Sequence, residues 1–110
     1  MGAMEREWRA IKADAGDPAR QEAVIRNIDL MIRESAISKL GVPGAIRRMP
    51  AEKQAEAVKS YHAMMLSTIK TLVALEEAVV EKKAEEIKKC IEQLDELEKK
   101  GHAEFLPEQQ

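Results

Sequence analysis

The sequence is poor in residues that break helices and in residues that cross-link a chain. Its 110 residues include 5 glycines, 4 prolines and 1 cysteine. A single cysteine excludes an internal disulfide and a zinc or redox motif that needs two. No run approaches the roughly 18 apolar residues of a membrane-spanning helix. The net charge of −2 also excludes a strongly basic nucleic-acid binder and an acidic tail.

Aromatic residues are scarce as well, at 3% of the chain, and they are Trp8, Tyr61 and Phe105. Ala, Glu, Lys, Leu, Ile and Met make up most of the remainder, and these are strong helix formers. The composition therefore predicts an all-α fold. A chain of this length buries roughly 65% of its unfolded surface without metal or disulfide support. With so few aromatic side chains, we hypothesise that another group fills part of the interior.

Helix breakers divide the chain at Gly16–Pro18, at Gly41–Pro50 and at Gly101. The first predicted helix runs from Met4 to about Ala13. The second covers about residues 18–40, with Asp17 as its N-cap, Pro18 at its first position and Gly41 as its stop. Apolar residues follow helical spacing in both segments. In the second segment the stripe contains Val24, Ile28, Met31, Ile32, Ser35 or Ala36, and Leu40.

The segment 41–50 is predicted to be one long loop, and its apolar residues Val42, Ile46 and Met49 indicate that it covers part of the protein. From Ala51 a helical pattern continues to about Lys100 without a breaker. Its apolar positions are Val58, Tyr61, Met65, Ile69, Leu72, Val73, Ala78, Val80, Ala84, Ile87, Ile91, Leu94 and Leu97.

Two folds are compatible with this long pattern. One continuous helix of about fifty residues would span roughly 75 Å and would require a second chain as partner. We favour a turn near Glu81–Lys83, where charge density is highest. This choice predicts an antiparallel up-down-up-down four-helix bundle that forms one domain over residues 1–110. Residues 1–3 resemble a remnant of a cloning vector, so the missing signal peptide carries no information on the compartment.

Few side chains in the sequence are candidates for catalysis. Cys90 lies on the apolar stripe and is expected to be a buried, unreactive thiol. The pairs Glu76–Glu77 and Glu85–Glu86 have lysines three or four residues away, so we expect solvated carboxylates. His62 lies off the stripe and is expected at the surface. The absence of Glu-x-x-His disfavours a di-iron bundle, and phosphate loops and nucleophile elbows are missing. We therefore predict no enzyme.

The predicted topology gathers several unusual side chains at one end of the bundle. The start of the first helix, the end of the last helix and the loop 41–50 all lie there, so Met4 and His102 come together. A methionine and a histidine form an axial ligand set for low-spin haem iron. The side chains expected to surround such a ring are Trp8, Tyr61, Met65 and Phe105. A flat macrocycle would also fill the space that the missing aromatic residues leave.

The end of the last helix resembles a known family. Its segment Gly101-His102-Ala103-Glu104-Phe105 is similar to the C-terminal signature of the cytochrome c′ and cytochrome b562 families. Glu98 and Gly101 stand where a c′ protein has its two cysteines, so the resemblance excludes thioether attachment and points to the b-type branch. Further similarity lies in Asp17-Pro18, in Met49-Pro50-Ala51-Glu52-Lys53 and in Leu75-Glu76-Glu77-Ala78.

The resemblance implies a small periplasmic b-type cytochrome that binds non-covalent haem b and transfers single electrons between redox partner proteins. It implies His102 as one axial ligand of the iron and Met4 as the other, with Met1 as an alternative to Met4. No nucleic-acid or membrane partner is expected, and the protein is a monomer or a homodimer. The competing hypotheses are a haem-free bundle with a structural or protein-binding role and an extended long-helix dimer.

Overall fold

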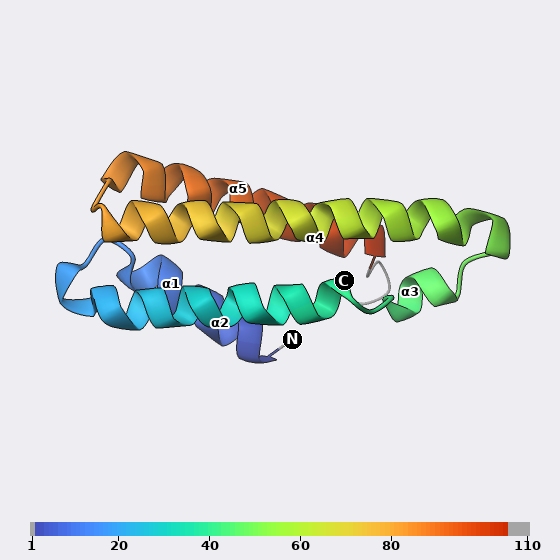
Figure 1. Cartoon of the computed structure of the whole chain (residues 1–110), viewed down its shortest axis with the longest axis horizontal. Helices are drawn as coiled ribbons and strands as arrows, with labels where there is room; N and C mark the ends of the chain where they lie inside the picture. The colour runs from blue at the N-terminus through green and yellow to red at the C-terminus, as the bar shows by residue number, and fades with distance from the viewer. Residues whose placement is uncertain (1, 106–110) are drawn as a thin grey trace.

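The chain forms four long helices in antiparallel order, and Figure 1 shows them as one elongated bundle. A computed structural model describes residues 2–105, and describes the side chains of residues 5–101, 103 and 104. The bundle measures 49 × 22 × 20 Å. The predicted all-α class and four-helix architecture are confirmed. The long helices are α1 (Gly2–Asp14), α2 (Gln21–Lys39), α4 (Ala51–Val80) and α5 (Ala84–Phe105).

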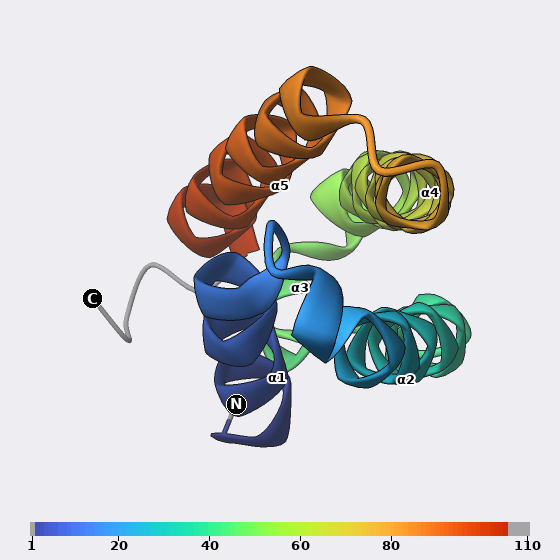
Figure 2. The same ribbon diagram turned by 90° about the vertical axis from the view of Figure 1, so that its left-hand side faces the viewer.

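Two helical hairpins build the bundle. α1 packs against α2, α4 packs against α5, and the hairpins meet where α2 lies along α4. Figure 2 shows α1 diagonally opposite α4, and α2 diagonally opposite α5. The end of α5 and the connection from α2 to α4 lie toward the same end of the bundle, and the start of α1 points toward that end (Figure 1). The order of the helices is as predicted, but α1 is short, so its start lies part-way along the bundle and does not reach that end (Figure 1).

The start of the second helix follows its predicted cap. Asp17 Oδ1 accepts a hydrogen bond of 3.0 Å from the backbone N–H of Ala19, and Pro18 occupies the first helical position. The first turn is a 3-10 helix, η1 (Pro18–Arg20), and α2 begins directly after it. An aspartate side chain satisfies a backbone donor that no helical carbonyl can reach, which fixes where the helix begins.

The chain reverses between α4 and α5, so the alternative of one continuous helix is wrong. Lys83 N–H donates to Ala78 O (2.9 Å) and Lys82 N–H donates to Val79 O (3.2 Å). This pair of bonds is the Schellman pattern, which closes a helix through one residue of left-handed backbone. That residue is Lys82, with φ of 58°. Glycine usually takes this position, and its absence is why the turn is hard to find in the sequence.

The connection from α2 to α4 differs from the long loop that was predicted. It contains a one-turn helix, α3 (Gly44–Arg47). Ile46 on this turn is fully buried, and the amide of Gln54 donates to Met49 O at 2.9 Å. The expectation that the segment covers part of the protein is therefore confirmed, and the apolar Ile46 explains why the segment folds back on the bundle.

The core is aliphatic, and several predicted core positions are wrong. Ile11, Ile28, Leu72 and Leu75 are completely buried. Leu40 is 85% exposed, because α2 ends at Lys39 and Leu40 lies at the edge of the bundle. On α4 the predicted positions with large exposed fractions are Val58 (37%), Val73 (44%) and Val80 (52%).

The helical repeat explains the errors on α4. Each residue turns the helix by about 100°, so Val73 and Val80 follow the buried Leu72 and Val79 but point to another face. None of the described helices is both long enough and apolar enough to cross a bilayer.

The left-handed residue in the turn generates a stability prediction. We expect Lys82→Gly to raise the free energy of unfolding by about 0.5–1 kcal/mol, because glycine adopts positive φ without the clash of a Cβ atom. Denaturant titration followed by the fluorescence of Trp8 measures the change. Lys83→Gly is the matched control and should destabilise, since no positive φ is found at Lys83. Equal effects of both substitutions would contradict this account of the turn.

Candidate functional site

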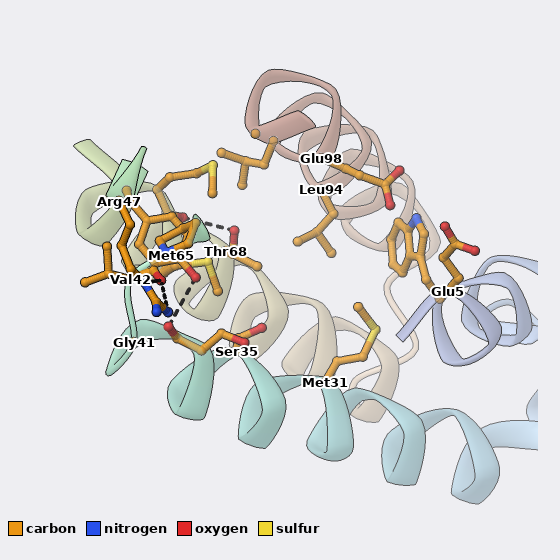
Figure 3. Close-up of a pocket in the computed structure, with 17 residues that line it drawn as sticks. Glu5, Met31, Ser35, Gly41, Val42, Arg47, Met65, Thr68, Leu94 and Glu98 are labelled. Atoms are coloured by element: carbon orange, nitrogen blue, oxygen red, sulfur yellow. Dashed lines mark hydrogen bonds between the residues drawn. The ribbon is translucent and has the colours of Figure 1, made fainter. Parts of the chain in front are cut away.

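A cavity of about 500 Å³ opens inside the bundle, and Figure 3 shows it. This volume lies within the range of roughly 300–1,000 Å³ that sites for cofactors and other small molecules occupy. Side chains of α1, α2, α4 and α5 line it, and the connection after α2 closes one end. Its apolar walls are formed by Trp8, Met31, Met64, Met65, Leu94 and Leu97.

Three of the predicted site residues meet in this cavity. Trp8 from α1 and Tyr61 and Met65 from α4 all line it. Met4, His102 and Phe105 belong to α1 and α5, but their side chains lie outside the described residues. Gly101, directly before His102, does line the cavity. The predicted site residues whose side chains are described therefore share one cavity.

The connection after α2 contributes to the wall as well. Val42 and Pro43 line the cavity, whereas Ile46 is buried but is not among the described lining residues. The sequence predicted that Val42 and Ile46 belong to a loop that covers part of the protein, and such a loop could shield the site. Only Val42 has that position, because Ile46 belongs to the helical turn α3.

Several lining residues were not predicted as part of a site. Met31, Leu94 and Leu97 were placed in apolar stripes without a role, and Met64 lies next to Met65 but was not singled out. For Met31 and Met64, the sequence feature that could have indicated a site is the abundance of methionine, with 6 in the chain. Methionine is flexible and polarisable, and it adapts to irregular or ligand-filled space better than leucine does.

Trp8 is held in place by a carboxylate of α5. Its indole Nε1–H donates to Asp95 Oδ1 at 3.0 Å, and Lys12 Nζ donates to the same oxygen at 3.4 Å. The Lys12 ammonium also lies 5.4 Å from the centre of the indole ring. These contacts join α1 to α5 and fix the orientation of the ring that forms the cavity wall.

The opposite end of the cavity is built by Tyr61 and Arg47. The Tyr61 hydroxyl donates to Ser38 O at 3.1 Å, and burial raises the pKa of this phenol. Arg47 donates to Val42 O through Nε (3.1 Å) and Nη2 (2.8 Å). Arg47 is the one cation among the described lining residues. The carboxylates of Glu5 and Glu98 also line the cavity, at the end away from Arg47 (Figure 3). The end built by Tyr61 and Arg47 therefore offers a guanidinium with N–H groups that remain for an anion.

One lining residue has an unused polar group, and another allows a close approach between α4 and α5. The Ser35 hydroxyl lines the cavity, is fully buried and has no hydrogen-bond partner among the described residues. At Gly101 an added Cβ would lie 2.8 Å from Met64 Sδ, so a side chain there would have to push Met64 aside. Apolar walls, thioether groups and one guanidinium suit a flat, mostly apolar group with an anionic edge.

Beside the cavity, two carboxyl groups join α1 to α2. Burial, followed by a hydrogen bond and repulsion from Glu34, raises the pKa of Glu7 to about 7, while the charge of Arg6 lowers it. Glu7 Oε1 is buried without a hydrogen-bond partner in the described structure. The pair therefore takes up a proton as pH falls through about 7, because a second negative charge beside Glu34 would be poorly solvated.

A second pair joins α2 to α4. The hydrogen bond with Asp29, then burial and the charge of Asp29, raise the pKa of Glu76 to about 7. Glu76 remains partly exposed, but the predicted lysine partner is wrong, because its carboxyl pairs with Asp29 of α2. The error arises because sequence spacing shows lysines on the same helix but does not show which group of a neighbouring helix faces the carboxylate.

The other predicted residues behave as simple structural groups. Cys90 is buried, and burial followed by the charge of Glu86 raises the pKa of its thiol, as expected for an unreactive cysteine. His62 is exposed, as predicted. Within the described part of the chain, no three His, Cys, Asp or Glu side chains are grouped so that they could hold a metal ion.

A comparison with protein families gives the same answer as the sequence motif. The family model for cytochrome b562 matches residues 1–105. The chain belongs to the cytochrome b562 family. This confirms the predicted resemblance. The matched residues include all of those that line the cavity described above. No curated protein and no solved structure gives a significant match to the chain.

The Glu7 pair generates a pH prediction for this cytochrome-family protein. The pKa of Glu7 is raised from 4.5 to about 7, so its stabilising contribution is complete below pH 4.5 and disappears as pH rises through 7. Glu7→Gln keeps a neutral group that can bond to Glu34, so the variant should lose this part of the pH dependence. Denaturation midpoints at pH 5 and pH 8 measure it. An unchanged difference between the two midpoints would contradict the shared proton.

Proposed function

We propose that the protein binds one haem non-covalently in the cavity and acts as a small one-electron carrier. The observation that carries the proposal is the position of the cavity. It is lined by Trp8, Tyr61 and Met65 and reaches Gly101, the residue before His102. Membership of the cytochrome b562 family supports the same cofactor.

The axial ligands in this proposal come from opposite hairpins of the bundle. His102 of α5 would supply an imidazole, and Met4 at the start of α1 would supply a thioether. Met1 is the alternative source of the sulfur ligand. With both axial positions filled, haem iron supplies a reversible one-electron change and leaves no open position for a substrate. The protein would then be a carrier and not an enzyme.

The residues of the cavity would bind and orient the ring. Met31, Met65 and Leu94 give it apolar contacts and exclude water, which lowers the dielectric and so influences the reduction potential. Trp8 is fixed by Asp95 and limits tilting of the ring at the side of α1. Val42 and Tyr61 cover the end of the cavity next to α3.

Arg47 would bind an acidic edge of the cofactor. Both of its existing hydrogen bonds go to Val42 O, which orients the guanidinium and leaves N–H groups without a partner in the described structure. A haem propionate is a carboxylate, and an arginine binds a carboxylate through charge-assisted hydrogen bonds. Redox partner proteins are the expected partners of such a carrier, and the family resemblance implies the periplasm as its compartment.

Binding of hemin tests the proposed function directly. We expect the purified protein to bind hemin stoichiometrically and to show sharp α and β bands after reduction. His102→Ala should lose these bands, because the imidazole ligand is gone. His62→Ala is the matched control and should keep them, since His62 is exposed and does not line the cavity. A free-haem spectrum for all three proteins would support the haem-free bundle instead.

The role of Arg47 is tested by the charge of the ligand. Arg47→Gln should weaken hemin binding about three- to tenfold, because one charge-assisted contact at an exposed site is lost. Hemin dimethyl ester has no carboxylates, so the substitution should leave its affinity unchanged. Arg20→Gln, an exposed arginine on η1, serves as control. Equal losses for hemin and for the ester would contradict the proposed contact.

A further inference from the structure

The exposed large apolar side chains are distributed unevenly over the bundle. Among the described residues they lie on α2, on Leu40 at its end, and on α4, and none lies on α1 or α5. On α4 they are Val58, Leu66, Val73 and Val80. Exposed apolar side chains that gather on one helix without a partner in the monomer are typical of an interface.

The exposed residues of α4 form one stripe. Leu66, Val73 and Val80 follow each other at intervals of seven residues, which keeps them on one side of a helix. Val58 and His62 continue the stripe toward the start of α4, and both are exposed. We refer to Val58, His62, Leu66, Val73 and Val80 as the α4 stripe. It is rotated by roughly 100° from the face that carries Met65 and Leu72, so it serves neither the core nor the cavity.

The two halves of the stripe have complementary shapes. Its first half contains a shallow depression, whose lining includes Ala55, His62, Ala63 and Leu66. Its second half carries exposed Val73 and Val80 with large exposed fractions, 44% and 52%. Small residues on one half can therefore receive branched side chains from the other half of a second helix that runs in the opposite direction.

The charged residues beside the stripe are also complementary between its two halves. Lys59 and Glu77 flank it on one side and are equally far in sequence from Thr68. Neither forms an ion pair in the described part of the chain. If two α4 helices cross antiparallel around a two-fold axis that passes outside α4 at the height of Thr68, Lys59 of each copy faces Glu77 of the other; the side chain of Thr68 itself lines the cavity. The same register sets Val73 of each copy opposite Ala63 of the other.

We propose that a second copy of this chain docks on the α4 stripe and forms a two-fold antiparallel dimer centred near Thr68. A two-fold contact needs one patch that is complementary to itself, and the stripe has this property in both shape and charge. Flanking ion pairs of this kind select orientation and partner in helical dimers. The cavity lies on another face of α4, so the dimer does not depend on the proposed haem function.

A charge swap tests the proposed register. The full-length protein without haem is examined by sedimentation equilibrium over a range of concentrations, and a monomer–dimer equilibrium is expected. Lys59→Glu and Glu77→Lys should each weaken the dimer at least about tenfold, because like charges then face each other at two symmetric places. The double variant should return to within about threefold of the original dissociation constant, since both ion pairs form again with reversed sign. Failure of this rescue would overturn the register.

An apolar pair of variants tests the surface itself. Leu66→Ser should dissociate the dimer, whereas Ile37→Ser should not, although Ile37 is more exposed at 60% against 41%. Ile37 lies on α2, outside the α4 stripe. Thermal melts by circular dichroism verify that each variant remains folded. A monomer at every concentration, or equal loss with Ile37→Ser, would overturn the proposal.

Discussion

The packing of α2 against α4 is the contact on which the rest of the structure depends. Each of these helices carries one neighbour, α1 on α2 and α5 on α4, so the contact joins two hairpins into one bundle. On the other side, α1 and α5 are connected by the bond from Trp8 to Asp95. The cavity lies between the hairpins, where α1 and α5 are not closely packed. The shape of the cavity therefore depends on the distance and angle between the two hairpins, which the contact of α2 with α4 determines.

Both long interfaces of α2 contain a carboxyl pair in which the pKa of one glutamate is raised to about 7. Glu34 pairs with Glu7 of α1, and Asp29 pairs with Glu76 of α4. In each pair the raised pKa of the glutamate means that acidification through about pH 7 strengthens the contact, while alkaline pH leaves two negative charges close together. α2 also supplies Met31 and Ser35 to the cavity. The helix whose contacts depend on proton uptake is therefore also a helix that forms the cavity wall.

The sequence predicted the helices well because their ends have local causes, such as the cap by Asp17. No glycine marks the turn at Lys82, and it was correctly favoured because one long helix could not form a compact domain and because charge density is highest near Glu81–Lys83. Cavity residues on the apolar stripe, Trp8 and Met65, could be predicted from topology. Arg47 could not, because its orientation depends on the backbone of the connection after α2, where Val42 O accepts both of its hydrogen bonds. The carboxyl pairs could not, because they depend on which side chain of another helix faces each carboxylate. Periodicity also could not separate the two apolar faces of α4.

Those two faces make α4 the element that serves both the interior and the surface. Met65 lines the cavity and its neighbour Leu66 lies 41% exposed on the α4 stripe. A helix turns by about 100° per residue, so adjacent residues can belong to different surfaces without sharing contacts. We therefore expect substitutions on the stripe to leave the cavity walls intact, and substitutions in the cavity to leave the stripe intact. The proposed assembly and the proposed ligand binding could then change independently, even though one helix carries residues for both.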